Sequence, residues 1–415
     1  MSAWFDTAGL GLFIHWDHAS QQGLEISWPL VGGGTILPHV QDVTPEQYHS
    51  SAATFDPQAW DPAALAALAK RVGVQYAVLT TKHHSGFSMF DTALDDFSVV
   101  KASPYGRDIV REFADAMRGE GIRVGFYFSL CDWHRPEYPA FTAEHRPYRL
   151  GASPPMPSEA EWEKYLDFMF GQLRELLSQY GTVDLVWFDG GWERRRDAWR
   201  PRELEAMMRA LQPDLVINDR LPSVGDYVTP EQFVPPTPTE GKWETCMTMN
   251  ESWAWNPADT DYKSARSLVH TLCEVVGRGG NLLLNVSPRG DGSLPPEQVE
   301  RLEHVGRWMA RYGESVLGVT PGLEAWQHYG PSTRRGRRVY VHLLSRPYDS
   351  VTVRGVRVRA IDAVTEVASG RPLSYTTRTG IMESFQDDPE GELTITVPPE
   401  LVDDDATVLA IDFRE

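Results

Sequence analysis

Seven short apolar segments that end in polar side chains are the feature that most constrains the fold of this chain. They cover residues 10–16, 77–84, 124–129, 183–190, 215–220, 243–246 and 282–285. Short segments that are apolar along their length indicate strands of a parallel sheet buried on both faces. Amphipathic segments separate these strands, at residues 57–71, 108–119, 158–176, 201–212, 262–277 and 296–312. This alternation predicts βαβ units up to about residue 315.

The polar residues at the strand ends indicate where a site lies. In a (β/α)8 barrel the catalytic groups lie at the C-terminal ends of the strands. We therefore predict an α/β fold of the (β/α)8-like (TIM) barrel type. Only seven strands are clear, and the candidate for the eighth, residues 315–317, is short, so we expect an irregular or incomplete barrel. Long loops at 133–157 and 221–240 are expected to help build the site.

The pattern changes after about residue 322. Short β-type segments separated by Gly, Pro and Asp follow at residues 339–344, 351–353, 393–397 and 407–411. Such spacing is typical of an antiparallel β-sandwich. We predict two domains, a barrel over residues 1–322 and a sandwich over residues 323–415.

Composition narrows the classes of partner. The chain has 39 Lys and Arg against 58 Asp and Glu, a formal charge of −19, which disfavours binding to nucleic acid and to anionic membrane surfaces. Its three cysteines show no CxxC spacing, which argues against a disulfide scaffold or a zinc ribbon. The N-terminal residues do not resemble a signal peptide, and no segment approaches the length of a membrane span. We expect a cytoplasmic protein and leave its oligomeric state open.

Several motifs occur in a fixed order along the first 320 or so residues. They are Trp4-Phe5 with Gly11 to Trp16, Thr80 to Phe87, Arg107-Asp108, Tyr127 to Leu130, Trp187 to Gly190, Asn218 to Arg220, Trp243 to Cys246 and Gly279 to Asn285. With these motifs the chain resembles glycoside hydrolase family 29, the α-L-fucosidases. The resemblance implies a (β/α)8-like barrel with a C-terminal β-sandwich. Three residues depart from the family pattern: Asp17 stands where Gly is usual, Ser85 where Asp is usual, and Ala254 interrupts a typical SWGY.

Two carboxyl groups are needed for glycoside hydrolysis. The resemblance implies that Asp189 is the nucleophile, and the alternative is an Asp that caps the following helix. It also implies that Glu231, in Thr229-Pro230-Glu231, is the acid/base, although Thr229 and Pro230 also form a good helix start. Glu244 competes for the acid/base role because it is expected to end a strand and sits in a family-like Trp-Glu pair; the alternative is a supporting carboxylate that holds a His or Arg in place.

We also predict a set of sugar-binding residues: His15, Trp28, His83, His84, Tyr127, Arg220, Glu244, Trp253 and Trp255. Core packing is the alternative for the aromatic residues, and a structural ion pair is the alternative for Arg220. Because consecutive strand residues point to opposite faces, His83 and His84 can both reach one sugar only beyond the end of the strand. The histidines lack HExxH or another metal-ligand spacing, so we predict no metal and no cofactor.

These residues together predict an exo-acting, retaining α-L-fucosidase whose partner is a fucosylated oligosaccharide or glycoside. A related exo-glycosidase such as an α-L-galactosidase is the alternative, and a non-catalytic carbohydrate-binding protein on the same scaffold is a third. We expect preference for L-fucose to arise from an apolar wall, at Trp253 or Trp255, against the methyl group on C5.

Overall fold

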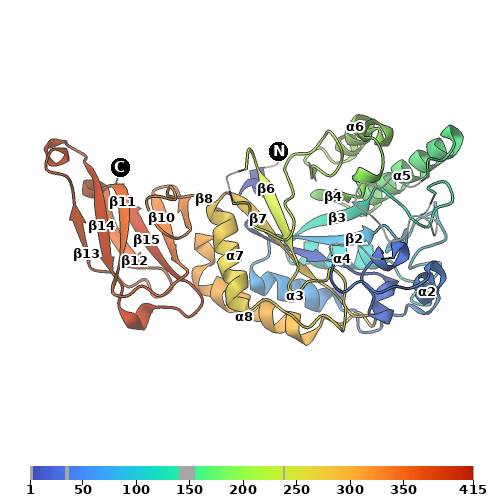
Figure 1. Ribbon diagram of the computed structural model, residues 1–415, viewed down its shortest axis with the longest axis horizontal. Coiled ribbons are helices and arrows are strands. Elements are labelled where there is room, and N and C mark those ends of the chain that lie inside the picture. Colours follow the sequence, from blue (N-terminus) through green and yellow to red (C-terminus); the bar gives the residue numbers. More distant parts are fainter. Residues whose placement is uncertain (1–2, 33–36, 140–154, 237–238, 415) are drawn as a thin grey trace.

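The computed structural model describes residues 3–32, 37–139, 155–236 and 239–414. Residues 140–154 of the predicted loop 133–157 lie outside these ranges. The chain forms a barrel with helices around it and, at the opposite end of the molecule, a pair of antiparallel sheets (Figure 1). Among the described helices, none is both long and apolar enough to cross a membrane.

The first part of the chain forms a curled, seven-stranded parallel sheet in the order β5-β4-β3-β2-β1-β7-β6. Its strands are β1 Leu10–Ile14, β2 Tyr76–Lys82, β3 Arg123–Ser129, β4 Leu185–Asp189, β5 Val216–Ile217, β6 Trp243–Met247 and β7 Gly280–Val286. Every residue of these strands is buried except Arg123, as expected for a parallel sheet covered on both faces. The seven strands predicted from the sequence are confirmed.

An irregular segment fills the gap between β5 and β6. Tyr227 bridges Asn218 beside β5, Val228 bridges Trp243 of β6, and Glu231 bridges Cys246, each in parallel register. The candidate eighth strand at residues 315–317 was wrong, because a 3-10 helix, Gly313–Ser315, ends there. The eighth position of the barrel is instead occupied by the segment that carries Glu231.

Helices cover the outside of the barrel. They are α1 Ala3–Asp6, α2 Pro45–Ser50, α3 Pro62–Val72, α4 Ile109–Gly119, α5 Glu159–Gln179, α6 Pro201–Leu211, α7 Ala265–Gly277 and α8 Pro296–Tyr312. Their starts follow from capping chemistry: Asp61, Asp108 and Ser264 each accept a backbone N–H of the first turn. Ser158 and Glu161 form a capping box at the start of α5. The buried apolar residues of α2 to α8 and many of those of the strands form one continuous core, whereas Phe5 of α1 belongs to a second cluster with Phe13, Tyr76, Tyr127 and Trp187.

The C-terminal sheets are antiparallel, as predicted. One has the order β12-β15-β10-β9-β8 and the other the order β11-β14-β13. The strands are β8 Thr320–Pro321, β9 Ser332–Arg335, β10 Arg338–Leu343, β11 Ser350–Arg357, β12 Ile361–Glu366, β13 Tyr375–Arg378, β14 Glu390–Thr396 and β15 Thr407–Phe413. Valine, leucine and isoleucine side chains from both sheets form a core of their own. The boundary at residue 322 stays a prediction; β8 already pairs with β9 just before it.

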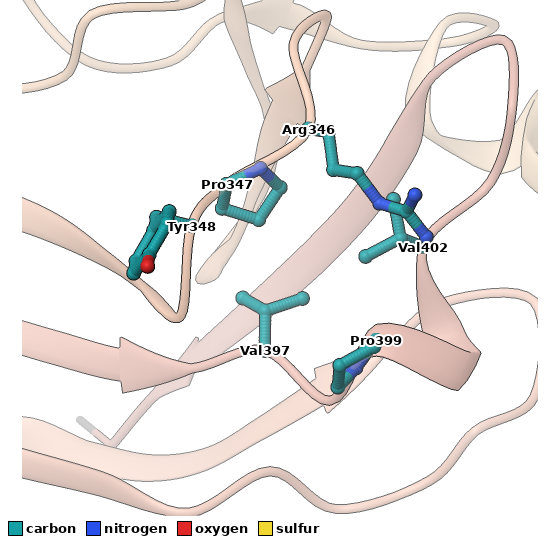
Figure 2. Close-up of a pocket in the computed structure, with 6 residues that line it drawn as sticks. All are labelled: Arg346, Pro347, Tyr348, Val397, Pro399 and Val402. Atoms are coloured by element: carbon teal, nitrogen blue, oxygen red, sulfur yellow. The ribbon is translucent and has the colours of Figure 1, made fainter.

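One surface hollow of about 300 Å³ lies in the sandwich, between the turn after β10 and the segment after β14. Figure 2 shows its lining residues, which are Arg346, Pro347, Tyr348, Val397, Pro399 and Val402. None of the six carries a carboxylate. The hollow therefore lacks the paired acids that glycoside hydrolysis requires.

Candidate active site

A cavity of about 340 Å³ opens at the C-terminal ends of the barrel strands. It is lined by Phe13, His15, Trp28, Leu37, His83, Tyr127, Trp187, Asp189, Trp192, Arg220, Glu231, Cys246 and Trp253. Most of the residues predicted from the sequence therefore share one cavity, although they come from segments far apart in the chain. This placement at the strand ends is the one expected for a barrel enzyme.

Asp189 is the last residue of β4 and is only 8 % exposed. Its Oδ1 accepts a hydrogen bond from Arg220 at 3.0 Å, and its Oδ2 accepts one from the Tyr127 hydroxyl at 3.0 Å. Burial opposes its ionisation, but Arg220, His84 and these hydrogen bonds hold the pKa of Asp189 below its ordinary value. Asp189 is therefore an ionised carboxylate facing the cavity.

The turn after β4 leaves Asp189 free of the helix-capping role considered above. The short 3-10 helix that follows, Gly191–Glu193, has Gly190 at its N-cap position and no side-chain cap. Gly190 has a φ of +78°, and a Cβ there would lie 2.7 Å from the Cys131 sulfur. Only glycine fits this sharp turn, which ends the strand with the carboxylate at the rim.

Arg220 contacts both Glu231 and Asp189 and so links the two carboxylates. The guanidinium donates to Glu231 Oε2 at 2.5 Å, and its Nε donates to Thr229 Oγ1 at 3.1 Å. The Glu231 side chain is 37 % exposed, so it is the more open of the two carboxylates. No helix begins at Thr229; the next residue after Glu231, Gln232, has a φ of +63° that stops a helix from forming.

Glu244 occupies a different layer of the barrel. The expectation that it ends a strand was wrong, because it is the second residue of β6 and the strand continues to Met247. It is fully buried and accepts hydrogen bonds from Tyr76, from Trp187 Nε1 at 3.0 Å and from Tyr227 at 3.4 Å. Burial raises its pKa to about 7. Trp187 lines the cavity but Glu244 does not, so Glu244 supports the cavity floor from below. It is not placed to contact a ligand directly.

Each of the three predicted histidines contacts a neighbouring side chain through its Nδ1 atom. His15 Nδ1 lies 2.7 Å from Asn285 Oδ1, His83 Nδ1 lies 2.7 Å from Ser27 Oγ, and His84 Nδ1 lies 2.7 Å from Ser129 Oγ. These contacts orient the rings and leave Nε2 available. Burial lowers the pKa of His15 to about 3 and of His84 to about 4, and it lowers the pKa of His83 well below its usual value.

His83 and His84 can both reach the site because β2 ends at Lys82. His83 lines the cavity, and His84 Nε2 lies 3.7 Å from Asp189 Oδ2. Both histidines therefore lie beyond the end of the strand, which is the condition under which both can reach one sugar.

The predicted tryptophans separate into two groups. Trp28 and Trp253 line the cavity, and the Trp253 ring lies 4.7 Å from that of His15. Trp255 is not among the lining residues; the guanidinium of Arg289 lies over its ring at 5.7 Å.

Five lining residues were not predicted: Phe13, Leu37, Trp187, Trp192 and Cys246. The two-residue period of a strand could have identified some of them, because Trp187 precedes Asp189 by two positions and Cys246 follows Glu244 by two. Leu37 and Trp192 lie outside the strands, where no such period applies.

His83, His84 and Asp189 are the one group of potential metal ligands found among the described residues, with donor atoms within 4.8 Å of one another. Both oxygens of Asp189 already accept hydrogen bonds, one of them from a guanidinium. A positive charge at this distance opposes a second cation. These residues therefore fit a hydrogen-bonding role better than a metal site.

The sequence model of the α-L-fucosidases matches residues 1–314 of this chain. The chain belongs to the α-L-fucosidase family. It is 30 % identical over 381 residues to the tissue α-L-fucosidase of Homo sapiens, covering 85 % of this chain and 77 % of that one. It is 28 % identical over 385 residues to the α-L-fucosidase of Dictyostelium discoideum, covering 85 % and 80 %.

Solved fucosidases have the same fold. α-L-Fucosidase isoenzyme 1 from Paenibacillus thiaminolyticus has a TM-score of 0.84 and 34 % identity, with 99 % of this chain and 98 % of that chain covered. A family 29 α-L-fucosidase from Bacteroides thetaiotaomicron, solved as a trapped covalent intermediate, has a TM-score of 0.83 and 26 % identity, with 99 % and 95 % covered. This α-L-fucosidase is thus a retaining glycoside hydrolase with a (β/α)8-like barrel and a C-terminal β-sandwich.

Proposed function

We propose that this α-L-fucosidase removes terminal fucosyl residues in two displacements, with Asp189 as nucleophile and Glu231 as general acid and base. One observation carries the proposal: the Arg220 guanidinium donates to both carboxylates, at 3.0 Å and 2.5 Å, within one cavity. Retaining glycosidases place these groups roughly 5–5.5 Å apart. Two carboxylates bound to one guanidinium are consistent with such a separation.

In the first displacement, Asp189 attacks the anomeric carbon. The bond from that carbon to the leaving oxygen breaks, Glu231 gives its proton to that oxygen, and a β-fucosyl ester of Asp189 forms. Attack neutralises Asp189 as proton loss makes Glu231 anionic. Arg220 contacts both, so its charge faces an anionic carboxylate before and after the step.

In the second displacement, Glu231 takes a proton from water, and the resulting hydroxide attacks the anomeric carbon of the ester. The bond to Asp189 breaks and α-fucose leaves, so the net configuration is retained. The greater exposure of Glu231 suits this step, because water and the departing alcohol must both reach it.

The remaining lining residues suit a single sugar ring. The cavity volume lies at the lower end of the range for ligand pockets, which favours one terminal residue over an internal stretch of a chain. Neutral His15, His83 and His84 would hydrogen-bond to the hydroxyls through Nε2. Trp253 would form the apolar wall against the C5 methyl group, a role for which Trp255 is poorly placed.

α-L-Galactoside hydrolysis is the alternative activity, because L-galactose differs from L-fucose only by a hydroxyl on C6. A hydrophobic wall discriminates against an added hydroxyl by about 10²-fold at most. Rates on aryl α-L-fucoside and aryl α-L-galactoside should therefore favour the fucoside. Trp253→Ala should narrow that gap, and Trp255→Ala should leave it unchanged. If both variants kept the full preference for the fucoside, the wall would lie elsewhere and both residues would only pack.

The anomer released first tests the two-displacement mechanism. We expect NMR spectra recorded during the first turnovers to show α-fucose, which then converts slowly to the equilibrium mixture. Initial release of β-fucose would reject the proposal, since a single displacement inverts the anomeric carbon.

A further inference from the structure

Two of the residues that depart from the family pattern contact each other. The Ser85 hydroxyl donates to Asp17 Oδ2 at 3.1 Å, although the two residues are far apart in the sequence. Both are buried, and neither lines the cavity. The family pattern described above has Gly and Asp at these positions, whereas this chain has Asp and Ser. The acidic residue of this pair is therefore at position 85 in the usual family pattern and at position 17 in this chain.

Asp17 has no cationic partner among the described residues. Its Oδ1 accepts the Ala19 backbone N–H at 2.7 Å, and its Oδ2 accepts the Tyr48 hydroxyl at 3.3 Å in addition to Ser85. Burial raises its pKa to about 6. A buried carboxylate without a cation is costly to ionise. Asp17 Oδ1 offsets part of that cost by capping the 3-10 helix His18–Gln22, whereas Oδ2 contacts Tyr48 and Ser85.

Both side-chain partners of Asp17 hold Ser27. The Tyr48 oxygen accepts the Ser27 backbone N–H at 2.7 Å, and the Ser85 backbone N–H donates to Ser27 Oγ at 2.8 Å. Ser27 has a φ of +62°, a conformation that residues other than glycine adopt at a cost. Such a conformation persists only where neighbouring contacts fix it, and these contacts come from Tyr48 and Ser85.

Ser27 in turn holds His83. Its Oγ lies 2.7 Å from His83 Nδ1 and accepts a hydrogen bond from the Ser85 backbone N–H; among the described residues, Nδ1 is the acceptor that lies within reach of its own proton, and we assign that proton to this contact. The His83 proton then resides on Nε2, on the side of the cavity. His83 also stacks on Tyr127, with ring centroids 5.1 Å apart, and Tyr127 donates to Asp189.

We propose that Asp17 is a positioning residue that, through Ser85 and Tyr48, fixes Ser27 and thereby the tautomer and orientation of His83. His83 would then present an Nε2–H donor to a hydroxyl of the bound sugar. The catalytic consequence rests on the proposed function, whereas the effect on the imidazole does not depend on turnover.

A double-mutant cycle tests the link. Asp17→Asn should lower kcat/KM on aryl α-L-fucoside by about 10-fold, the value of roughly one hydrogen bond. In a His83→Ala background the same change should have less than about a 2-fold effect, because the group that it positions is gone. Equal losses in both backgrounds, or no loss in either, would overturn the proposal.

The matched control is Ser51→Ala. Ser51 is another buried serine, and its Oγ lies 2.7 Å from Nδ1 of His18, which does not line the cavity. Its removal should leave kcat/KM unchanged. If it lowered kcat/KM as much as Asp17→Asn does, a general loosening of this region would replace the proposal.

A second variant covers the case in which Asp17→Asn fails to fold. The exchange Asp17→Gly with Ser85→Asp returns the carboxylate to the other segment, and it should fold and regain most of the wild-type kcat/KM. A folded but inactive exchange variant would contradict the proposal.

Nitrogen-15 NMR of the imidazoles separates this proposal from the proposed function. The His83 signal, assigned by its loss in His83→Ala, should report the Nε2–H tautomer in the wild type and a tautomer mixture in Asp17→Asn. This readout holds whatever sugar the enzyme cleaves. The same tautomer in both proteins would overturn the proposal.

Discussion

Asp189 and Glu244 are two buried carboxylates inside one barrel, and they differ in their partners. Each lies on a parallel strand and accepts hydrogen bonds from aromatic side chains. Asp189, at the mouth, also contacts Arg220, whereas no ion pair of Glu244 is found in the described part of the chain. The pKa of Asp189 is lowered, and burial raises that of Glu244 to about 7.

Position along the strand and contact with one cation therefore decide whether a carboxylate of this barrel is ionised and can reach a ligand. At the rim, Arg220 keeps Asp189 ionised and the cavity gives it access to a ligand. One layer below, Glu244 is held by Tyr76, Trp187 and Tyr227 and supports the cavity floor. In the proposed mechanism, the same functional group is therefore a nucleophile in one layer and a structural support in the next.

The largest expected effect on kcat is that of replacing Asp189, at the mouth of the barrel. Asp189→Ala should lower kcat on aryl α-L-fucoside by a factor on the order of 10³ or more, because the covalent route is removed. Circular dichroism should show an unchanged fold. A variant with near-normal kcat would break the comparison, since Asp189 would then be no more a nucleophile than Glu244.

Leaving-group dependence separates Glu231 from Glu244. Glu231→Ala should slow substrates with poor leaving groups by about 10²–10⁴-fold and activated aryl fucosides far less, because only the former need protonation. Glu244→Ala should slow both classes of substrate alike, because it disturbs the floor of the cavity. Steady-state rates over a series of aryl and alkyl fucosides measure this, and the reverse pattern would transfer the acid/base role to Glu244.

The pH dependence of the free energy of unfolding tests the buried state of Glu244, in the lower layer of the barrel. The pKa of Glu244 is raised on folding, so the folded state binds the extra proton, and its ionisation lowers stability as pH rises from about 4.5 to 7. Glu244→Gln should remove up to about 3 kcal/mol of this fall. Urea unfolding of the variant and the wild type at pH 5 and pH 8 measures the difference between their slopes. Both proteins share the other contributions, which fall with pH for Asp17 and Glu25 and rise with pH for buried histidines such as His15 and His84, whose pKa values are lowered. An unchanged slope would contradict the burial of an ionisable Glu244.

The smallest expected effect is that of chelation. EDTA should leave activity unchanged, because hydrogen bonds from Arg220 and Tyr127 occupy both oxygens of Asp189. Activity is measured before and after dialysis against EDTA. A reversible loss that one added metal restores would make His83, His84 and Asp189 a metal site.

Much of the barrel could be predicted because its strands are apolar along their length and end in distinctive motifs. The eighth position could not, because Tyr227 to Glu231 contains Pro230 and is joined to its neighbours by isolated bridges. In the sandwich, β9, β12 and β13 were not predicted: β13 is exposed throughout, and the other two carry many polar residues.

Side-chain roles were harder to predict than strands. Trp253 and Trp255 are indistinguishable in the sequence, and only the path of the chain places one of them in the cavity wall. Ser27 has no sequence signal, because its positive φ arises from contacts with Tyr48 and Ser85 and not from a glycine. Tertiary contacts of this kind produce no periodic pattern in the sequence.

The most direct test of the central claim is chemical rescue of Asp189→Ala by azide. If Asp189 is the nucleophile, azide can occupy the space left by the carboxylate and attack the same face of the sugar. We predict that azide restores turnover of an activated aryl α-L-fucoside and that NMR identifies the product as β-fucosyl azide. Failure of azide to restore turnover in a folded variant, or formation of the α-azide, would contradict the assignment of Asp189.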